Sequence, residues 1–290
     1  MSAAPPASRF RVVVHADVRG FLDRAAPWLL RREAEHSLVL GIAGRLAAGE
    51  IPDRPALLLA TVEGPDVVGV ALRTPPYKLI LTRMPAGALP AVAEAAEAFG
   101  PLPAVLGPPD VAEAFGAVWA GRHGVKARAG MRQRVFELTR LVPPERTPPG
   151  TARPARPGDL DRVADWVAAF EADVGTTTPS DPRAWAERHV GAGDVWLWDH
   201  DGPASMAAVI ARSPTGARVG AVYTPAPLRG RGYATAVVAE VTRRALDRGS
   251  RFCSLYTDLA NPTSNAIYRR LGYVPVVDAL DVEFAPAGPA

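Results

Sequence analysis

The stretch Val222-Tyr223-Thr224-Pro225-Ala226-Pro227-Leu228-Arg229-Gly230-Arg231-Gly232-Tyr233-Ala234 decides how the C-terminal half of the chain folds. A strand-like run ends within it, because its two prolines cannot continue a hydrogen-bonded ladder. Apolar residues then recur at helical spacing. The first four amides of a helix have no partner inside the helix and carry positive partial charge. We therefore predict a strand, a tight turn and a helix N-terminus that accepts phosphate oxygens.

Two glycines and two arginines give this turn the properties of a phosphate-binding loop. Gly230 and Gly232 let the backbone approach a pyrophosphate without a Cβ in the way. Arg229 and Arg231 can add charge-assisted hydrogen bonds of about 1.5–3 kcal/mol each. The turn is neither a Walker loop nor a dinucleotide-binding fingerprint. The alternative interpretation is a plain strand-to-helix turn that contains two glycines.

A second motif follows at Asn261-Pro262-Thr263-Ser264-Asn265-Ala266-Ile267-Tyr268-Arg269-Arg270-Leu271-Gly272-Tyr273. Asn261 is a good N-cap and Pro262 a good first helical residue. Asn261, Asn265 and Tyr268 fall at positions i, i+4 and i+7, on one stripe that is too polar for a routine core face. The alternatives are that Asn261 only caps the helix and that Tyr268 only packs.

Together the two motifs resemble the signatures of one family. Arg229-x-x-Gly232-x-Ala234 after a strand resembles the pyrophosphate-binding signature of the GNAT superfamily of acetyltransferases. The second motif is similar to the superfamily's Asn-x-x-Ser/Ala-x-x-Leu/Ile-Tyr-x-x-x-Gly-Tyr/Phe helix. The resemblance extends over residues 151–284. It implies an acetyl-CoA-dependent N-acetyltransferase that moves an acetyl group to an amine acceptor.

The resemblance also implies roles for particular residues. The strand edge at Val222–Thr224 would bond the pantetheine amides and polarise the thioester carbonyl, and the matching asparagine would hold the pantetheine arm. Tyr268 would be the catalytic general acid, since a hydroxyl with a pKa near 10 can protonate a thiolate whose conjugate acid has a pKa near 8.5. The expected cofactor-binding residues are Val222, Tyr223, Thr224, Arg229, Gly230, Arg231, Gly232, Tyr233, Ala234, Asn261, Ser264, Asn265 and Tyr268, with no metal site.

Two further questions concern the chemistry. The general base stays open among Glu171, Asp173, His189 and Tyr223 acting through water, because their spacing selects none of them. Cys253, the only cysteine, lies in an apolar strand-like run, which favours a packed thiol over a nucleophile. We therefore expect direct attack of the amine in a ternary complex.

The proline-rich segment 142–150 predicts a boundary between two domains, because neither helix nor ladder can pass through it. Downstream, the pattern predicts the order β-α-α-β-β-β-α-β-α-β. The elements are helices after Asp159 and Asp181, strands at 195–198, 204–211 and 218–224, a helix at 234–245, a strand at 252–257, a helix at 262–271 and a last strand pair after Tyr273.

The N-terminal half gives a fainter version of the same order. Strands are expected at 10–14 and near 57, 67, 79, 105 and 136, with helices from 17, 88 and 110. This predicts an internal duplication, with an unrelated α/β domain as the alternative. The run Met84-Pro85-Ala86-Gly87-Ala88 lacks the arginine and glycine character of the later turn. The prediction is thus an α/β (α+β) chain with a degenerate GNAT-like domain at 1–141, a linker at 142–150 and a GNAT domain at 151–290, each domain a mixed, mostly antiparallel sheet flanked by helices.

Composition narrows the remaining classes. The 290 residues include 33 basic and 30 acidic side chains, so the formal net charge of +3 gives little support to nucleic-acid binding. No apolar run is long enough to cross a bilayer, and Met1–Ser8 does not resemble a secretory signal. We expect a cytoplasmic monomer or homodimer with acetyl-CoA and an amine as partners. A non-catalytic acyl-CoA sensor and an arginine-rich nucleic-acid binder are the competing readings.

Overall fold

The computed structural model describes residues 9–51, 57–175 and 181–286 of the chain. The chain divides into two compact units, the first formed by residues 1–134 and 277–290 and the second by residues 135–276. The start Met1–Ser8, on which the expectation about a secretory signal depends, lies outside the described residues.

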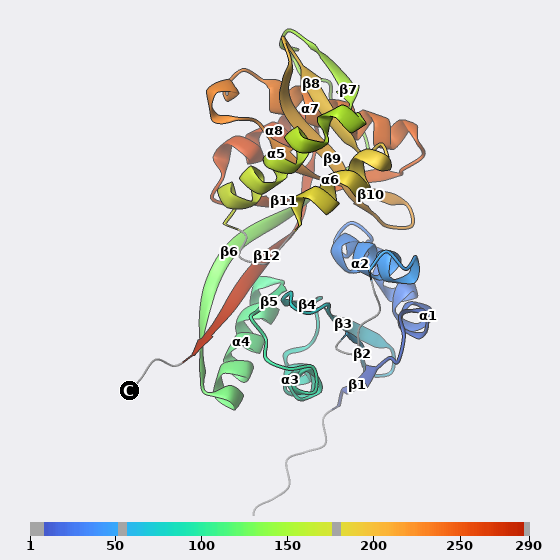
Figure 1. Ribbon diagram of the computed structural model, residues 1–290. Coiled ribbons are helices and arrows are strands. Elements are labelled where there is room, and N and C mark those ends of the chain that lie inside the picture. Colours follow the sequence, from blue (N-terminus) through green and yellow to red (C-terminus); the bar gives the residue numbers. More distant parts are fainter. Residues whose placement is uncertain (1–8, 52–56, 176–180, 287–290) are drawn as a thin grey trace, which may run out of the picture. The chain divides into compact units, whose positions relative to one another are not determined.

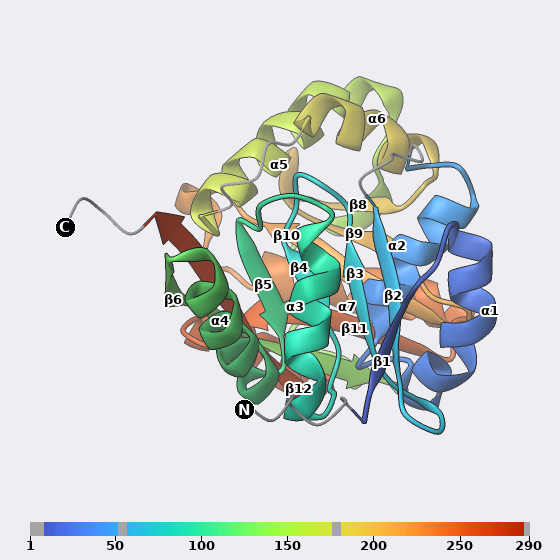
Figure 2. The ribbon, with the colours of Figure 1, turned by 90° about the horizontal axis from the view of Figure 1, so that it is seen from below.

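The first unit is a sheet with two helices on each face (Figure 2). Alternation along one strand shows the two faces, because Leu58 and Ala60 pack with α3 and α4 while Leu59 packs with α1 and α2. The elements are β1 (Arg11–Val14), α1 (Val18–Leu29), α2 (Ser37–Ala47), β2 (Leu58–Glu63), β3 (Val67–Arg73), β4 (Leu79–Leu81), α3 (Leu89–Glu97), β5 (Ala104–Gly107), α4 (Pro109–His123) and β6 (Val125–Leu138).

The second unit repeats this order of elements (Figure 1). Ala207 and Val209 pack with α7, whereas Met206 and Ala208 pack with α5 and α6 on the other face. The elements are β7 (Thr151–Pro154), α5 (Leu160–Asp173), α6 (Pro182–Gly191), β8 (Val195–Asp199), β9 (Pro203–Arg212), β10 (Gly216–Tyr223), α7 (Tyr233–Asp247), β11 (Phe252–Asp258), α8 (Pro262–Arg270) and β12 (Val274–Pro286).

The order predicted for the C-terminal half is confirmed, and the same order is present in the N-terminal half. One helix of the first unit, α2, was not predicted from the sequence. Its residues Ser37–Ala47 are apolar on nearly every side, and its N-cap His36 makes no side-chain cap bond, so neither amphipathic periodicity nor a capping signal marks it.

The final strands depart from a simple repeat. In the first unit β5 pairs with β12, through residues such as Val105 and Val282, whereas in the second unit β11 lies next to β6. Each half of the chain therefore contributes its last strand to the sheet of the other half. The predicted strand pair after Tyr273 is wrong, because Val274–Pro286 forms one strand. Asp278 and Asp281 within it are ion-paired with Arg134 and Lys78, so the ladder continues through both acidic residues.

The proline-rich segment is packed on the second unit. The amide of Val142 donates to the carbonyl of Leu271 at 2.9 Å, and Trp198 Nε1 donates to the carbonyl of Pro149 at 3.0 Å. Gly150 has a φ of +112°, and a Cβ at this position would lie 2.3 Å from the carbonyl oxygen of Asp199. The division between the compact units falls at 134/135 and 276/277 rather than in this segment. The domain limits 1–141 and 151–290 stay a prediction.

None of the helices in the described ranges combines the length and apolarity needed to cross a bilayer.

A buried carboxylate joins three elements of the first unit. Glu63, at the end of β2, accepts hydrogen bonds from Arg24 Nε at 2.8 Å, Arg11 Nη2 at 3.0 Å and Thr61 Oγ1 at 3.0 Å. The hydrogen bond from Arg24 outweighs the opposing effect of burial and, with Arg11 and Thr61, lowers the pKa of Glu63 from 4.5 to about 2. The ionised carboxylate thus holds β1, α1 and β2 together.

Replacing Glu63 with Gln should lower the free energy of unfolding at neutral pH by about 1–2 kcal/mol, after allowance for solvent screening of the exposed arginines. A group with a lowered folded-state pKa stabilises above its unfolded value, so the difference should disappear as the pH falls from about 4.5 toward 2. Urea unfolding at several pH values measures this. Glu97→Gln, which removes the exposed pair with Arg122, is the control and should show no comparable loss. Equal effects of the two variants would contradict the argument.

Candidate functional site

Two parallel strands of the second unit separate after a short paired stretch. Strands β10 and β11 pair at Gly216, Ala217 and Arg218, which lie opposite Phe252, Cys253 and Ser254. Farther along β10, Ala221 has a φ of +49° and the register with β9 shifts between Gly220 and Tyr223. Such a bulge bends one strand away from its neighbour. The residues Val222, Tyr223 and Thr224, predicted to contact the cofactor, lie on the separated part.

A serine on the neighbouring strand holds this end of β10. Ser205 Oγ donates to the carbonyl of Tyr223 at 2.9 Å and lies 2.8 Å from Thr224 Oγ1. The Tyr223 ring lies 5.9 Å from the ring of Trp166 on α5. Neither Ser205 nor Trp166 was singled out from the sequence, because a serine in an apolar strand and a tryptophan on an amphipathic helix both read as packing residues.

The turn that follows has the conformation needed to expose helix amides. Gly230 and Gly232 have φ values of +77° and +86°, in the left-handed region that favours glycine. Gly232 is the N-cap of α7, and no side chain caps the helix. Both glycines and both arginines of the turn are exposed. The first amides of α7 are therefore available to an anion, as the sequence predicts for this segment.

The two arginines brace the turn. Arg229 Nε donates to the carbonyl of Thr224 at 2.9 Å, and its guanidinium forms a 2.6 Å ion pair with Asp173 at the end of α5. Arg231 donates to the carbonyl of Pro227 at 3.2 Å. Asp173, one of the candidate bases, is thus engaged by Arg229.

Tyr233 and its neighbour Ala234 begin α7, and the Tyr233 side chain points into the core. It is 3% exposed, and its hydroxyl lies 2.6 Å from Nδ1 of His200 in the turn between β8 and β9. The buried side chain therefore fixes the start of α7 to the core and to the β8–β9 turn. Among the predicted cofactor-binding residues, Tyr233 can offer a phosphate only its backbone amide.

Helix α8 carries the asparagine and tyrosine stripe. The side chain of Asn261 accepts from the amide of Ser264 at 3.0 Å, which confirms the predicted cap. Asn265 Nδ2 donates to the carbonyls of Asp258 at 2.9 Å and Asn261 at 2.7 Å, so it joins the start of α8 to the end of β11. Its Oδ1 atom is buried without a hydrogen-bond partner. A buried amide oxygen of this kind is suited to accept an N–H from a ligand.

Two buried tyrosines lie together in the core of the second unit, with their rings 5.9 Å apart. Tyr273 is satisfied, because its hydroxyl lies 2.7 Å from Thr242 Oγ1. Tyr268 packs against Phe136 with ring centroids 6.4 Å apart, and its hydroxyl makes no hydrogen bond within the described part of the chain. Burial raises the pKa of Tyr268 to about 12. Tyr268 therefore stays protonated at neutral pH, with a donor to offer.

His189, another of the candidate bases, belongs to a different cluster. His189 on α6 is buried, and its Nδ1 lies 3.9 Å from Asp194 Oδ2, a residue that pairs with Arg212 at the start of the β9–β10 turn. That turn is at the opposite end of β10 from the phosphate loop. In the described residues, no group of three or more histidine, cysteine or acidic side chains could hold a metal ion.

Two residues that were not singled out from the sequence, Arg218 and Tyr256, lie on the face of the sheet opposite α7. The guanidinium of Arg218 on β10 lies 6.0 Å from the ring centroid of Tyr256 on β11. Strand alternation places both on the face opposite Ala217 and Leu255, which pack with α7. The alternation of side chains along β10 and β11 is the sequence signal that could have placed both residues on this face.

The described residues of the first unit do not repeat the glycine turn that precedes α7. Its β4 is three residues long and pairs with β5 at Leu79 and Ile80. Met84, which follows the strand, is 7% exposed and packs in the core with Leu89 at the start of α3. The segment before this helix start has one exposed arginine, Arg83, and one exposed glycine, Gly87, but Gly87 does not have a positive φ and Met84 is buried.

Comparison with known proteins agrees with this architecture. Residues 197–279 match the family model described as FR47-like protein, and no curated protein matches the chain. A GCN5-related N-acetyltransferase from Sphaerobacter thermophilus has a similar fold, with 19% identity, a TM-score of 0.61, and 97% of this chain and 96% of that chain covered. A GNAT-family acetyltransferase from Colwellia psychrerythraea has 12% identity and a TM-score of 0.57, with 95% and 100% covered.

The tandem arrangement is also found among solved structures. A tandem GNAT protein from the clavulanic acid biosynthesis pathway has 15% identity and a TM-score of 0.51, with 97% of this chain and 99% of that chain covered. Identities at this level report on the fold. The chain therefore has the fold of tandem GNAT proteins, and residues 197–279 are similar to the FR47-like family.

Proposed function

We propose that the protein is an acetyl-CoA-dependent N-acetyltransferase whose active site lies in the second unit. The observation that carries the proposal is that β10 pairs with β11 over three residues only, while an uncapped helix start follows β10 and helix α8 follows β11. A long ligand with an anionic end and an amide-bearing arm matches these features. The partners are acetyl-CoA and an amine, and we infer a cytoplasmic monomer or homodimer that binds neither nucleic acid nor membrane.

The residues present fit an acyl-CoA. The pyrophosphate would accept hydrogen bonds from the first amides of α7 and from Arg229 and Arg231, which are exposed beside them. The pantetheine arm would lie in the gap between β10 and β11, where backbone groups of Val222–Thr224 can bond its amides. The unpartnered Oδ1 of Asn265 would receive one of its N–H groups. When bound, the cofactor supplies the acetyl thioester.

The acceptor amine attacks the thioester carbonyl directly. Deprotonation of an alkyl amine with a pKa near 10.4 costs about 4.6 kcal/mol at pH 7, so a base is required and its identity stays open. As the carbonyl oxygen gains charge, a backbone amide of the separated β10 edge stabilises it. Loss of the thiolate would leave the electron pair on sulfur, where Tyr268 would donate its hydrogen bond, and the base would take the proton that the attacking nitrogen releases.

Tyr268 acts as the general acid toward the departing sulfur. With a pKa of about 12 it is a poorer acid than a free thiol, so its proton moves late, and its main effect is a hydrogen bond that strengthens as negative charge develops. The partnerless hydroxyl supports this role, because no bond within the protein competes for it. Retention of such a tyrosine also weighs against the alternative, an acyl-CoA sensor without catalysis.

Tyr268→Phe should lower kcat by about 100-fold or more, because it removes the donor at the sulfur. The KM for acetyl-CoA should change less than threefold. Steady-state CoA release with a panel of small amines, polyamines, amino acids and peptide N-termini measures both constants. Tyr273→Phe is the matched control: it removes the hydrogen bond to Thr242, so it should lower stability and leave kcat nearly unchanged. Full activity of the Tyr268 variant would refute the assignment, and tight binding without turnover on any acceptor would favour the sensor.

Gly232→Ala should weaken acetyl-CoA binding by about tenfold or more. The added Cβ strains a residue at φ +86° and displaces the helix amides that face the pyrophosphate. Gly124→Ala is the control, because Gly124 has a φ of +63° with nothing within 4 Å of the added carbon. The two variants should lose similar stability, and isothermal titration should detect weaker binding in the first alone. Unchanged affinity in both would place the phosphate site elsewhere.

Direct attack predicts that Cys253 takes no part. The thiol is fully buried, donates to the carbonyl of Thr242 at 3.8 Å, and has its pKa raised to about 12 by burial. Iodoacetamide should leave the native protein unmodified and alkylate the denatured protein, and Cys253→Ala should keep kcat within about twofold. A covalent acetyl-enzyme seen by mass spectrometry after incubation with acetyl-CoA would rule out direct attack.

A further inference from the structure

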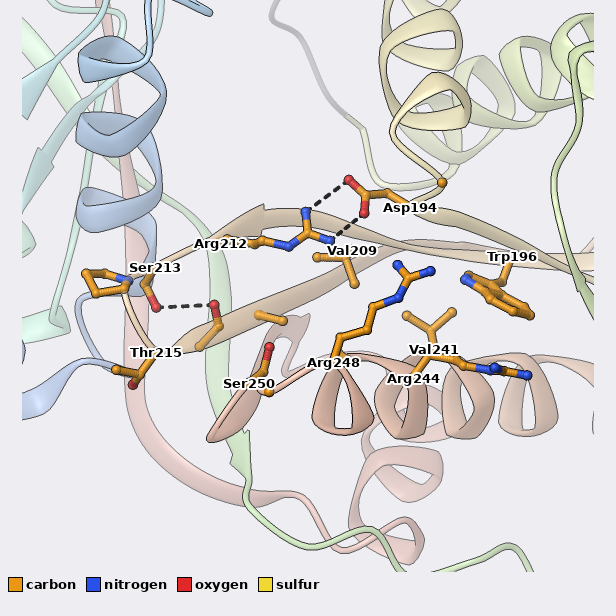
Figure 3. Close-up of a pocket in the computed structure, with 16 residues that line it drawn as sticks. Asp194, Trp196, Val209, Arg212, Ser213, Thr215, Val241, Arg244, Arg248 and Ser250 are labelled. Atoms are coloured by element: carbon orange, nitrogen blue, oxygen red, sulfur yellow. Dashed lines mark hydrogen bonds and ion pairs between the residues drawn. The ribbon is translucent and has the colours of Figure 1, made fainter.

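The second unit contains a cavity that the proposed acetyl transfer does not use. It has a volume of about 220 Å³ and lies where the β9–β10 turn meets the end of α7 and the loop before β8 (Figure 3). Its position is the start of β10, at Gly216 and Ala217, whereas the phosphate loop follows the other end of that strand at Tyr223. At about 3.3 Å per residue, roughly 23 Å of strand separates the two.

The charges that line the cavity are unbalanced. Three guanidinium groups, those of Arg212, Arg244 and Arg248, face one carboxylate, that of Asp194. Arg212 binds Asp194 through two hydrogen bonds, at 2.5 and 3.1 Å. Although burial opposes it, the two hydrogen bonds and the charge of Arg212, with His189 nearby, lower the pKa of Asp194, so the carboxylate remains ionised and paired.

Arg248 is the cation of the cavity that lacks a partner. Arg244 donates to Glu240 at 2.7 Å and lies over the Trp196 ring at 4.9 Å, so it is directed along the helix. Arg248, by contrast, makes no hydrogen bond or ion pair within the described ranges. Figure 3 shows its side chain extending from the end of α7 toward the space between Val209 and Trp196. An anion at this point would be attracted by an uncompensated guanidinium.

The end of α7 does not cancel this attraction. Its last carbonyls accept from the amides of Arg248, Gly249 and Ser250, at 3.1, 2.9 and 3.1 Å, so the helix end is closed by its own backbone. The residual dipole amounts to about half a negative charge, less than the charge of one guanidinium. Ser250 also lines the cavity, and Figure 3 draws its side chain on the side of Thr215, away from the guanidinium of Arg248.

The base of the cavity is apolar. It is formed by buried side chains of β9, β10 and α7: Val209, Ala217, Val241 and Ala245. At roughly 30 Å³ per water-sized group, the volume accommodates about seven such groups. A ligand of this size can satisfy both the guanidinium and the apolar base. Its negatively charged end would lie at Arg248, and its short hydrocarbon chain would lie on Val209 and Val241.

We propose that this cavity binds a small aliphatic monocarboxylate of about four to six carbons. The carboxylate accepts hydrogen bonds from the guanidinium of Arg248, and the hydrocarbon chain packs against Val209 and Val241. The cavity does not include the phosphate loop. The test of carboxylate binding is therefore independent of the acetyltransferase proposal.

Butyrate is the probe, and binding to the full chain is followed by saturation-transfer NMR and by amide shifts in an isotope-labelled sample. We expect a millimolar Kd that weakens at least tenfold in Arg248→Gln, which keeps the aliphatic stem and removes the charge. Arg243→Gln is the matched control, because Arg243 is a neighbour on α7 that pairs with Glu240 and Asp247 and does not line the cavity. Its Kd should equal that of the unaltered protein.

Ligand variants separate carboxylate recognition from general anion attraction. Acetate should bind about tenfold more weakly than butyrate, because two methylene groups fewer are buried. Butyramide, which is neutral, should bind at least tenfold more weakly than butyrate. Equal binding in the two arginine variants, or inorganic phosphate binding as tightly as butyrate, would overturn the proposal.

Discussion

The parting of β10 from β11 after three residue pairs is the constraint on which the second unit depends. Backbone groups of a parallel pair ordinarily satisfy one another, so a gap between two such strands leaves donors and acceptors that need other partners. The positive φ of Ala221 and the register shift against β9 open the gap. Ser205 then stabilises the displaced end by bonding Tyr223 and Thr224.

The polar side chains near the ends of α7 and α8 differ in whether the protein itself satisfies them. Tyr233, Tyr273 and Asn261 are bonded within the protein, to His200, Thr242 and the amide of Ser264. In the described part of the chain, the Tyr268 hydroxyl and the Oδ1 atom of Asn265 have no hydrogen-bond partner. The proposed function depends on this difference, because a buried polar group without a partner costs free energy that a ligand can recover.

The two halves have the same order of elements but differ in the segment that follows the fourth strand. Both follow β-α-α-β-β-β-α-β-α-β, and both have an α-helix after the fourth strand. In the first half that strand is three residues long and is followed by the buried Met84. In the second half it is eight residues long and is followed by exposed glycines with positive φ. The duplicated fold is therefore shared, while the local turn chemistry differs.

The sequence by itself determined the order of elements, the cap at Asn261, the glycine turn and its absence after Met84, because each depends on residues that are neighbours in the chain. Only the tertiary structure decided which last strand joins which sheet, since β6 and β12 pair across long stretches of sequence that no local pattern records. It also decided that Tyr233 faces the core while Tyr268 keeps its hydroxyl unpartnered, and that Arg248 lies beside a cavity formed with the β9–β10 turn. These outcomes depend on distances between distant residues, and folding sets such distances through packing.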